Sequence, residues 1–340
     1  MRERIKWVDM AKTIGILTIV LGHTVAEGML KTYVYSFHIP LFFFLSGATF
    51  RVKDKTFGKF VKDKAMGLLV PYAVFALISQ AVYALIQSMA SNLIQSERGF
   101  SLMEGWTGIL MGSVEANRAL WFLPCLFLMS LMLYPIIRRL ERHAPHAQLF
   151  AACAMGISVL FTILDEYFFK IGTLPWKLDA ALKLLAFALG GWFFVRTAGR
   201  VHMRKAMLRV CTLVLLLIGC VTGIFLNERV MYLGAVYGNV PVFYLSSICS
   251  VLGLSFLFTG LESCPLLEKT GQHTLAILVM HKFPVLFFEW VCPGVKNWMA
   301  AGVLLAEIAV VIISMGMCCA AEWIIMKICP CMLGRFNRRV

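Results

Sequence analysis

Three polar residues share one face of the first apolar run of the chain: Asp9, Lys12 and His23. Lys12 and His23 are eleven residues apart, which is three turns of α-helix to within about 20°. They are therefore separated by roughly 16 Å along the helix axis. Asp9 precedes Lys12 by about one turn and extends the line. Histidine is a natural general base near neutral pH, and a lysine ammonium offers a point charge to an anion.

The composition places these residues in a membrane. The chain has 340 residues, of which 60% are hydrophobic and 15% charged, with a mean hydropathy of +0.81. A soluble protein is nearer half apolar and one quarter charged. In a soluble chain the net charge of +14 would favour a nucleic-acid partner, but here we expect the lipid bilayer as partner and no nucleic acid.

Apolar stretches long enough to cross a bilayer recur along the sequence, and about 20 residues are needed for each crossing. They predict an all-α membrane protein, a bundle of about ten transmembrane helices that forms a single membrane-embedded domain over residues 1–340 with no appended soluble domain. The predicted spans are 8–28, 34–50, 66–88, 117–136, 148–164, 180–196, 207–226, 242–261, 272–291 and 299–326.

The basic residues predict the orientation of this bundle. Most of the 32 Lys and Arg residues fall in the terminal segments and in the loops after even-numbered spans. Short cytoplasmic loops collect such residues, so we expect both termini in the cytoplasm of a cell-membrane protein, such as one of a bacterial inner membrane. Lys12 then lies near the cytoplasmic face and His23 in the outer half of the bilayer.

Two further histidines are expected in the same layer as His23. His38 stands two residues before Pro40 at the outer end of the second span, and His281 lies in the middle of the ninth. Proline lacks a backbone donor and disfavours helix just before it, so an irregular or re-entrant start is expected there. An ionisable group inside a span normally faces a cavity or a partner, although a structural histidine is the simpler interpretation.

Polar and aromatic residues also gather where the fourth span begins on the outer side. This cluster suits a sugar acceptor, although a tryptophan there is commonly an interfacial anchor. Its members are Glu115, Asn117, Arg118 and Trp121.

A basic loop follows the second span, with Lys59, Lys62 and Lys64 among its residues. It has two interpretations, ordinary cytoplasmic charge bias or a clamp for the phosphates of an anionic cytosolic cofactor. Lys12 likewise has two, a snorkelling anchor or a part of that clamp.

Taken together, these motifs resemble one known family, the integral-membrane acyltransferases of acyltransferase family 3, which includes sugar and polysaccharide O-acetyltransferases. The resemblance rests on Lys12 and His23 preceded by Asp9, and on three further motifs in the expected order: FHIPLFFFLSG, LWFLPCLF and GQHTLAILVMH. Many relatives have Arg where this chain has Lys12. The lysine keeps the positive charge but lacks the bidentate fork of a guanidinium group.

The resemblance implies acyl transfer, usually of acetyl from acetyl-CoA, to a hydroxyl of a carbohydrate or cell-surface glycan precursor, without a metal. His23 then acts as catalytic base with Lys12 as its basic partner, and Arg118, Asn117 or His281 stabilises the oxyanion. A covalent acyl-His23 intermediate is an open alternative. The rival class is a proton-coupled transporter or exporter, because buried His and Lys also suit proton-coupled transport.

Overall fold

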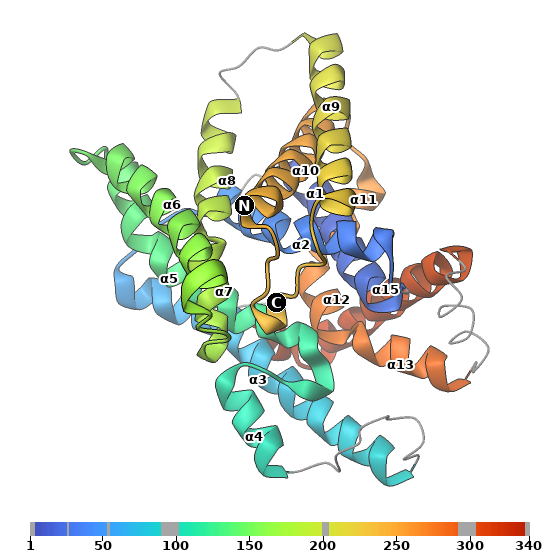
Figure 1. Cartoon of the computed structure of the whole chain (residues 1–340). Helices are drawn as coiled ribbons and strands as arrows, with labels where there is room; N and C mark the ends of the chain where they lie inside the picture. Colours follow the sequence, from blue (N-terminus) through green and yellow to red (C-terminus); the bar gives the residue numbers. More distant parts are fainter. Residues whose placement is uncertain are drawn as a thin grey trace.

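The computed structural model describes residues 4–25, 27–52, 55–89, 102–198, 204–291 and 304–336. Within these ranges the chain is almost entirely helical and has no strand, only an isolated bridge between Met231 and Val236. The N-terminal helices α1 and α2 lie amid the others (Figure 1). The α-helices are α1 Lys6–Thr24, α2 Met29–Ala48, α3 Phe57–Met89, α4 Leu102–Met111, α5 Phe122–Glu141, α6 Ala147–Leu164, α7 Leu178–Lys183, α8 Leu185–Ala198, α9 Lys205–Phe225, α10 Val240–Gly260, α11 Pro265–Gln272, α12 Thr274–Met280, α13 Lys282–Val291 and α15 Leu304–Ile328.

Short helical turns connect several of these helices. They are η2 Glu115–Trp121, η3 Asp165–Phe169, η4 Pro175–Lys177, η5 Tyr232–Gly234 and η6 Pro330–Leu333. The short helix α4 falls in the predicted loop between the third and fourth spans.

Among the described residues, six stretches of helix are long and apolar enough to cross a membrane, and a seventh is formed if the bent pair α7–α8 is one span. This confirms a multi-pass all-α membrane protein. The bend between α7 and α8 is 53°. The predicted ninth span is not one continuous helix, because it is broken at His281 into α12 and α13. The start of the predicted tenth span lies outside the described residues, and the total of ten and the cytoplasmic termini stay predictions.

The predicted irregular start of the second span is wrong, because α2 runs through Pro40 as one helix. Proline leaves the carbonyl four residues earlier, that of Ser36, without its helical donor. In the structure, the hydroxyl of Ser247 on α10 donates to the Ser36 carbonyl oxygen at 2.6 Å. A side chain of a neighbouring helix therefore compensates the proline, and α2 continues.

Glycines let the helices around α2 approach closely. A Cβ atom on Gly47 of α2 would lie 1.7 Å from the carbonyl oxygen of Ala188 on α8, and one on Gly191 would lie 1.9 Å from that of Phe44. Small residues at such crossings are typical of membrane helices, whose association depends on close packing. The same holds for α1 and α11, where a Cβ on Gly271 would lie 1.8 Å from the Asp9 carbonyl oxygen.

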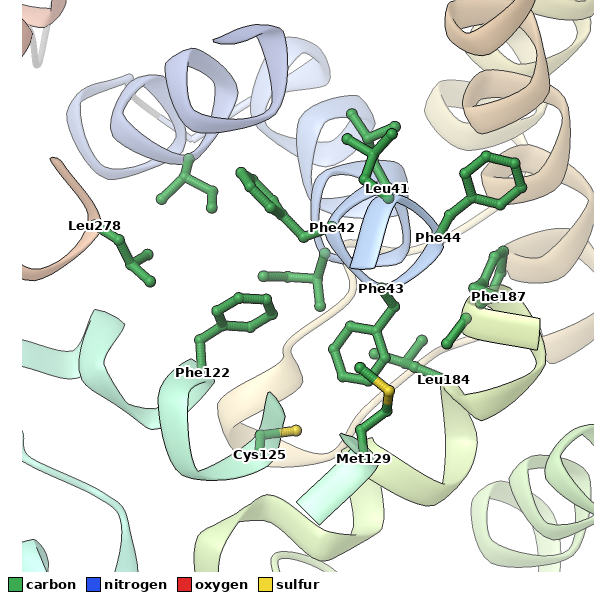
Figure 2. Packing of buried hydrophobic residues seen from close by; sticks show 14 of the residues in the cluster. Leu41, Phe42, Phe43, Phe44, Phe122, Cys125, Met129, Leu184, Phe187 and Leu278 are labelled. Carbon is green, nitrogen blue, oxygen red and sulfur yellow. The ribbon is translucent and has the colours of Figure 1, made fainter. Parts of the chain in front are cut away.

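The aromatic run of α2 forms the centre of the core. Phe42, Phe43 and Phe44 are buried and point in different directions from one helix (Figure 2). The rings of Phe42 and Phe43 meet Phe122 of α5 edge-on, with ring centres 5.8 and 5.9 Å apart. Such edge-on contacts are a preferred arrangement of aromatic pairs. The run thus packs in the core and holds α2 in place between its neighbours.

The connection between α9 and α10, residues 226–239, enters the protein interior. Tyr232 and Tyr237 in this connection are almost fully buried. Its backbone is held at the Ala235 carbonyl by Lys183 and at two N–H groups, those of Tyr237 and Gly238, by the carboxylate of Glu166. The path can be followed in Figure 1 between the lower end of α9 and α10. We call this segment the inner loop.

Candidate active site

Helix α1 contains all three polar residues of the predicted line and runs without a break from Lys6 to Thr24. Near its start, the Lys12 ammonium lies 3.4 Å from a carboxylate oxygen of Asp9, and Arg4 lies 3.8 Å from the other. His23 stands in the last turn, about 16 Å from Lys12 along the axis. Lys12 and Asp9 are therefore a paired group at the opposite end of the helix from His23.

His23 is exposed although Gly22 and Thr24 beside it are buried. Its imidazole lies against that of His281, with ring centres 5.2 Å apart and planes inclined by 35°. Lys282, His38 and Lys31 are also close enough for their charges to act on His23. Helix α2 and the junction of α12 with α13 therefore place two lysines and two further imidazoles around one accessible imidazole. Such surroundings favour negative charge developing on a reacting oxygen.

His281 stands at the break between α12 and α13 and is completely buried. Its Nδ1 lies 3.0 Å from the carbonyl oxygens of Ile277 and Leu278. Because a carbonyl oxygen only accepts, Nδ1 is assigned as the protonated nitrogen. Its Nε2 then carries a lone pair, and this atom has no hydrogen-bond partner.

Asn117 supports the same helix break from the other side. It has extended backbone angles inside η2, and its side chain is buried. Its amide donates to the Val279 carbonyl at 2.9 Å and to the Ser79 hydroxyl at 3.3 Å, while its own carbonyl oxygen has no partner. Asn117 therefore joins α3 to the last turn of α12, two residues before His281.

His38 is buried, and its Nδ1 lies 2.6 Å from the Val34 carbonyl oxygen. Its ring meets Tyr35 and Tyr232 edge-on, with ring centres 5.0 and 5.8 Å apart. The Tyr232 hydroxyl donates to the Tyr35 carbonyl at 2.9 Å. Burial raises the pKa of Tyr232 well above its usual value, so the phenol stays neutral and acts as a hydrogen-bond donor.

The other three residues of the cluster predicted to meet a sugar separate into two groups. Trp121 is buried and stacks on Tyr232, with ring centres 6.2 Å apart and planes inclined by 20°. Glu115 and Arg118 are exposed and pair with each other, with Arg118 Nε 2.8 Å from a Glu115 carboxylate oxygen. Trp121 therefore packs on Tyr232, which in turn contacts His38. The Glu115–Arg118 pair lies at the surface.

The basic residues predicted to bind a cofactor lie on the first turns of α3. Lys59 and Lys62 are exposed. Lys64 is partly buried, and its ammonium lies 5.0 Å from the centre of the Phe50 ring and 5.8 Å from that of Phe60. The aliphatic part of the Lys64 side chain covers aromatic surface. Lys59 and Lys62 are therefore the two lysines of this group that are more accessible to an anion.

Some of the residues around this site were not predicted as site residues. Lys31 stands out in the sequence only as a cation near the outer end of a span, and Lys282 as the ionisable neighbour of His281 in the middle of the ninth predicted span. Tyr232 lies in a segment that has neither helical nor strand periodicity. Nothing in a single sequence shows that a loop enters the protein, because this depends on contacts with distant side chains such as Glu166 and Lys183.

A family model described as "Acyltransferase domain" matches residues 5–326, which is nearly the whole chain. The chain therefore belongs to acyltransferase family 3. This confirms the resemblance seen in the sequence, and with the apolar helices it defines a multi-pass membrane acyltransferase. No curated protein and no solved structure matches the chain.

Proposed function

We propose that this protein transfers an acetyl group from cytosolic acetyl-CoA to a hydroxyl of a carbohydrate or cell-surface glycan precursor, with His23 as general base. The observation that carries the proposal is the accessible imidazole of His23 among buried neighbours, beside His281 and within range of Lys282 and Lys31. Proton chemistry at one imidazole is what an O-acyl transfer requires.

The donor end of the proposal is the face that carries Lys12, Lys59 and Lys62. There the phosphates of CoA meet the ammonium groups, and the narrow pantetheine arm extends along the bundle to bring the thioester to His23. The distance of about 16 Å between Lys12 and His23 along α1 is the distance that this arm spans.

In the reaction, the acceptor hydroxyl oxygen forms a bond to the thioester carbonyl carbon while His23 takes the hydroxyl proton. The carbon–sulfur bond then breaks, and the CoA thiolate leaves and takes up that proton. A positioned base contributes about 10²–10⁴-fold to such a step. The surrounding cations stabilise the oxyanion between the two steps.

The first experiment follows label from [¹⁴C]acetyl-CoA into acceptor in membranes that contain the full chain. His23→Ala is expected to abolish incorporation and to keep the unfolding midpoint of the purified protein. His273→Gln is a matched control, because His273 pairs with Glu322 on α15 and lies outside the His23 cluster. Full incorporation by His23→Ala would refute the assignment of the base.

The same experiment distinguishes the transporter alternative. Two broken helices, α7–α8 and α12–α13, are a feature that proton-coupled transporters also show. Movement of an unmodified solute without label on any acceptor would favour transport. Loss of an O-acetyl signal from the surface glycan of cells lacking the protein, measured by NMR, would support the enzyme and identify its acceptor.

A further inference from the structure

His281 has a buried ring nitrogen without a partner and lies beside the ring of His23. Its Nδ1–H is fixed by two backbone carbonyls, so its Nε2 is an acceptor that cannot change its role without breaking both contacts. This Nε2 is buried without a partner. A buried acceptor left unpaired costs about 1–3 kcal/mol, so an unpaired one in a native structure calls for an explanation.

The nearest ring provides that explanation. The centres of the His23 and His281 rings are 5.2 Å apart. An N–H···N hydrogen bond of about 3 Å between two imidazoles places their ring centres about 5 Å apart. His23 is exposed, so a small rotation of its side chain would complete such a bond.

The other histidine near this site makes its ring contacts with residues other than His23. His38 directs its Nδ1 to the Val34 carbonyl, and its ring contacts are with Tyr35 and Tyr232. The turn that leads to His281 is also held in place, because the Asn117 amide donates to the Val279 carbonyl. Of these two histidines, His281 therefore has the acceptor nitrogen that is better positioned to bind His23.

We propose that His281 is the positioning residue for His23, and that its Nε2 accepts a hydrogen bond from an imidazole N–H of His23. This fixes the His23 tautomer, so the second nitrogen of His23 presents its lone pair to the acceptor hydroxyl. His281 stays neutral throughout and stabilises the imidazolium that forms when His23 takes the hydroxyl proton. The proposal rests on the proposed acyl transfer and adds a second histidine to it.

Replacing His281 by asparagine or by glutamine provides a test that separates the roles of its two ring nitrogens. In His281→Asn the amide nitrogen replaces Nδ1 and keeps the contact with the helix break, but nothing replaces Nε2. In His281→Gln the amide reaches the position of Nε2 and offers an acceptor there, but the Nδ1 contact is lost.

The full chain is assayed in membranes with [¹⁴C]acetyl-CoA as the probe. His281→Asn is expected to lower kcat by about 10–100-fold, as removal of the hydrogen-bond partner of a metal-bound histidine does, with the KM for acetyl-CoA unchanged. His281→Gln is expected to restore most of that loss. The opposite order, with Asn active and Gln inactive, would show that His281 serves only the helix break and would overturn the proposal, as would full activity in both variants.

A second measurement does not depend on activity. ¹⁵N-histidine NMR of the full chain in nanodiscs, with His23 assigned from the His23→Ala spectrum, reports which ring nitrogen carries the proton. A single His23 tautomer in the wild type that becomes an average of two in His281→Asn supports the hydrogen bond. The same spectrum in both would overturn it. If the wild type transfers no label at all, the proposed function fails, while the NMR result still decides the hydrogen bond.

Discussion

The buried ion pair between Lys183 and Asp165 supports the inner loop on which the site depends. The Lys183 ammonium lies 2.6 Å from an Asp165 carboxylate oxygen, and their side chains are 0% and 3% exposed. The same ammonium lies 4.5 Å from the centre of the Tyr237 ring and 3.4 Å from the Ala235 carbonyl oxygen. This pair therefore connects the break between α7 and α8 to the loop that carries Tyr232.

Asp165→Asn removes one charge and keeps the shape of the side chain. The remaining amide oxygen still accepts from the Ile171 N–H, which lies 2.8 Å from Asp165 in the wild type. The buried Lys183 ammonium then loses the carboxylate that it contacts. Removal of one partner of a buried ion pair costs about 3–5 kcal/mol, since the other charge stays desolvated. Acyl transfer should fall in parallel, because Tyr232 packs on His38.

The double variant Asp165→Asn with Lys183→Met isolates the effect of charge. It removes both charges and keeps an apolar stem of similar length, so the loss of unfolding free energy should be smaller than the sum of the two single losses by several kcal/mol. The assay is denaturant unfolding in detergent, followed by tryptophan fluorescence. A loss below about 0.5 kcal/mol for Asp165→Asn, the range of an ordinary surface substitution, would refute this reasoning. Strict additivity in the double variant would refute it as well.

Three further substitutions, two of them compared with a control variant, test other contacts. Gly47→Ala should destabilise by about 1–3 kcal/mol because its Cβ would meet the backbone of α8, whereas Gly58→Ala, with nothing within 4 Å, should be neutral or stabilising in the same unfolding assay. Asn117→Ala should lower kcat more than Ser79→Ala, because it leaves the Val279 carbonyl, two residues before His281, without its donor; equal effects would contradict this. Tyr232→Phe should cost about 1 kcal/mol and keep most transfer, since only the hydroxyl contact is lost, and inactivity of this variant would show a direct role of the phenol.

A charge substitution tests the donor end of the proposal. Lys62→Gln should raise the KM for acetyl-CoA by up to about fivefold with kcat unchanged, the effect of one exposed ion pair. Lys327→Gln is the matched control, because Lys327 lies over the Trp323 ring on α15. An equal KM in the wild type and in Lys62→Gln would remove Lys62 from the donor site.

The sequence alone was sufficient for what depends on local pattern. Hydropathy determined that the chain is a helical membrane protein, and the spacing of Asp9, Lys12 and His23 placed them on one helix, as α1 shows. The motifs also identified the family. Each of these three properties depends on residue type and on the period of a single helix. None of them needs a contact between distant segments.

Only the tertiary structure decided how those helices are interrupted and what meets His23. Pro40 predicts an irregular start, but the hydroxyl of Ser247, more than two hundred residues later, supplies the missing donor and keeps α2 continuous. His281 looks like a mid-span residue in the sequence, yet it stands at a helix break with its ring against His23. The physical reason is that a break, like a proline inside a helix, is stable in a membrane only where other parts of the chain satisfy its backbone groups.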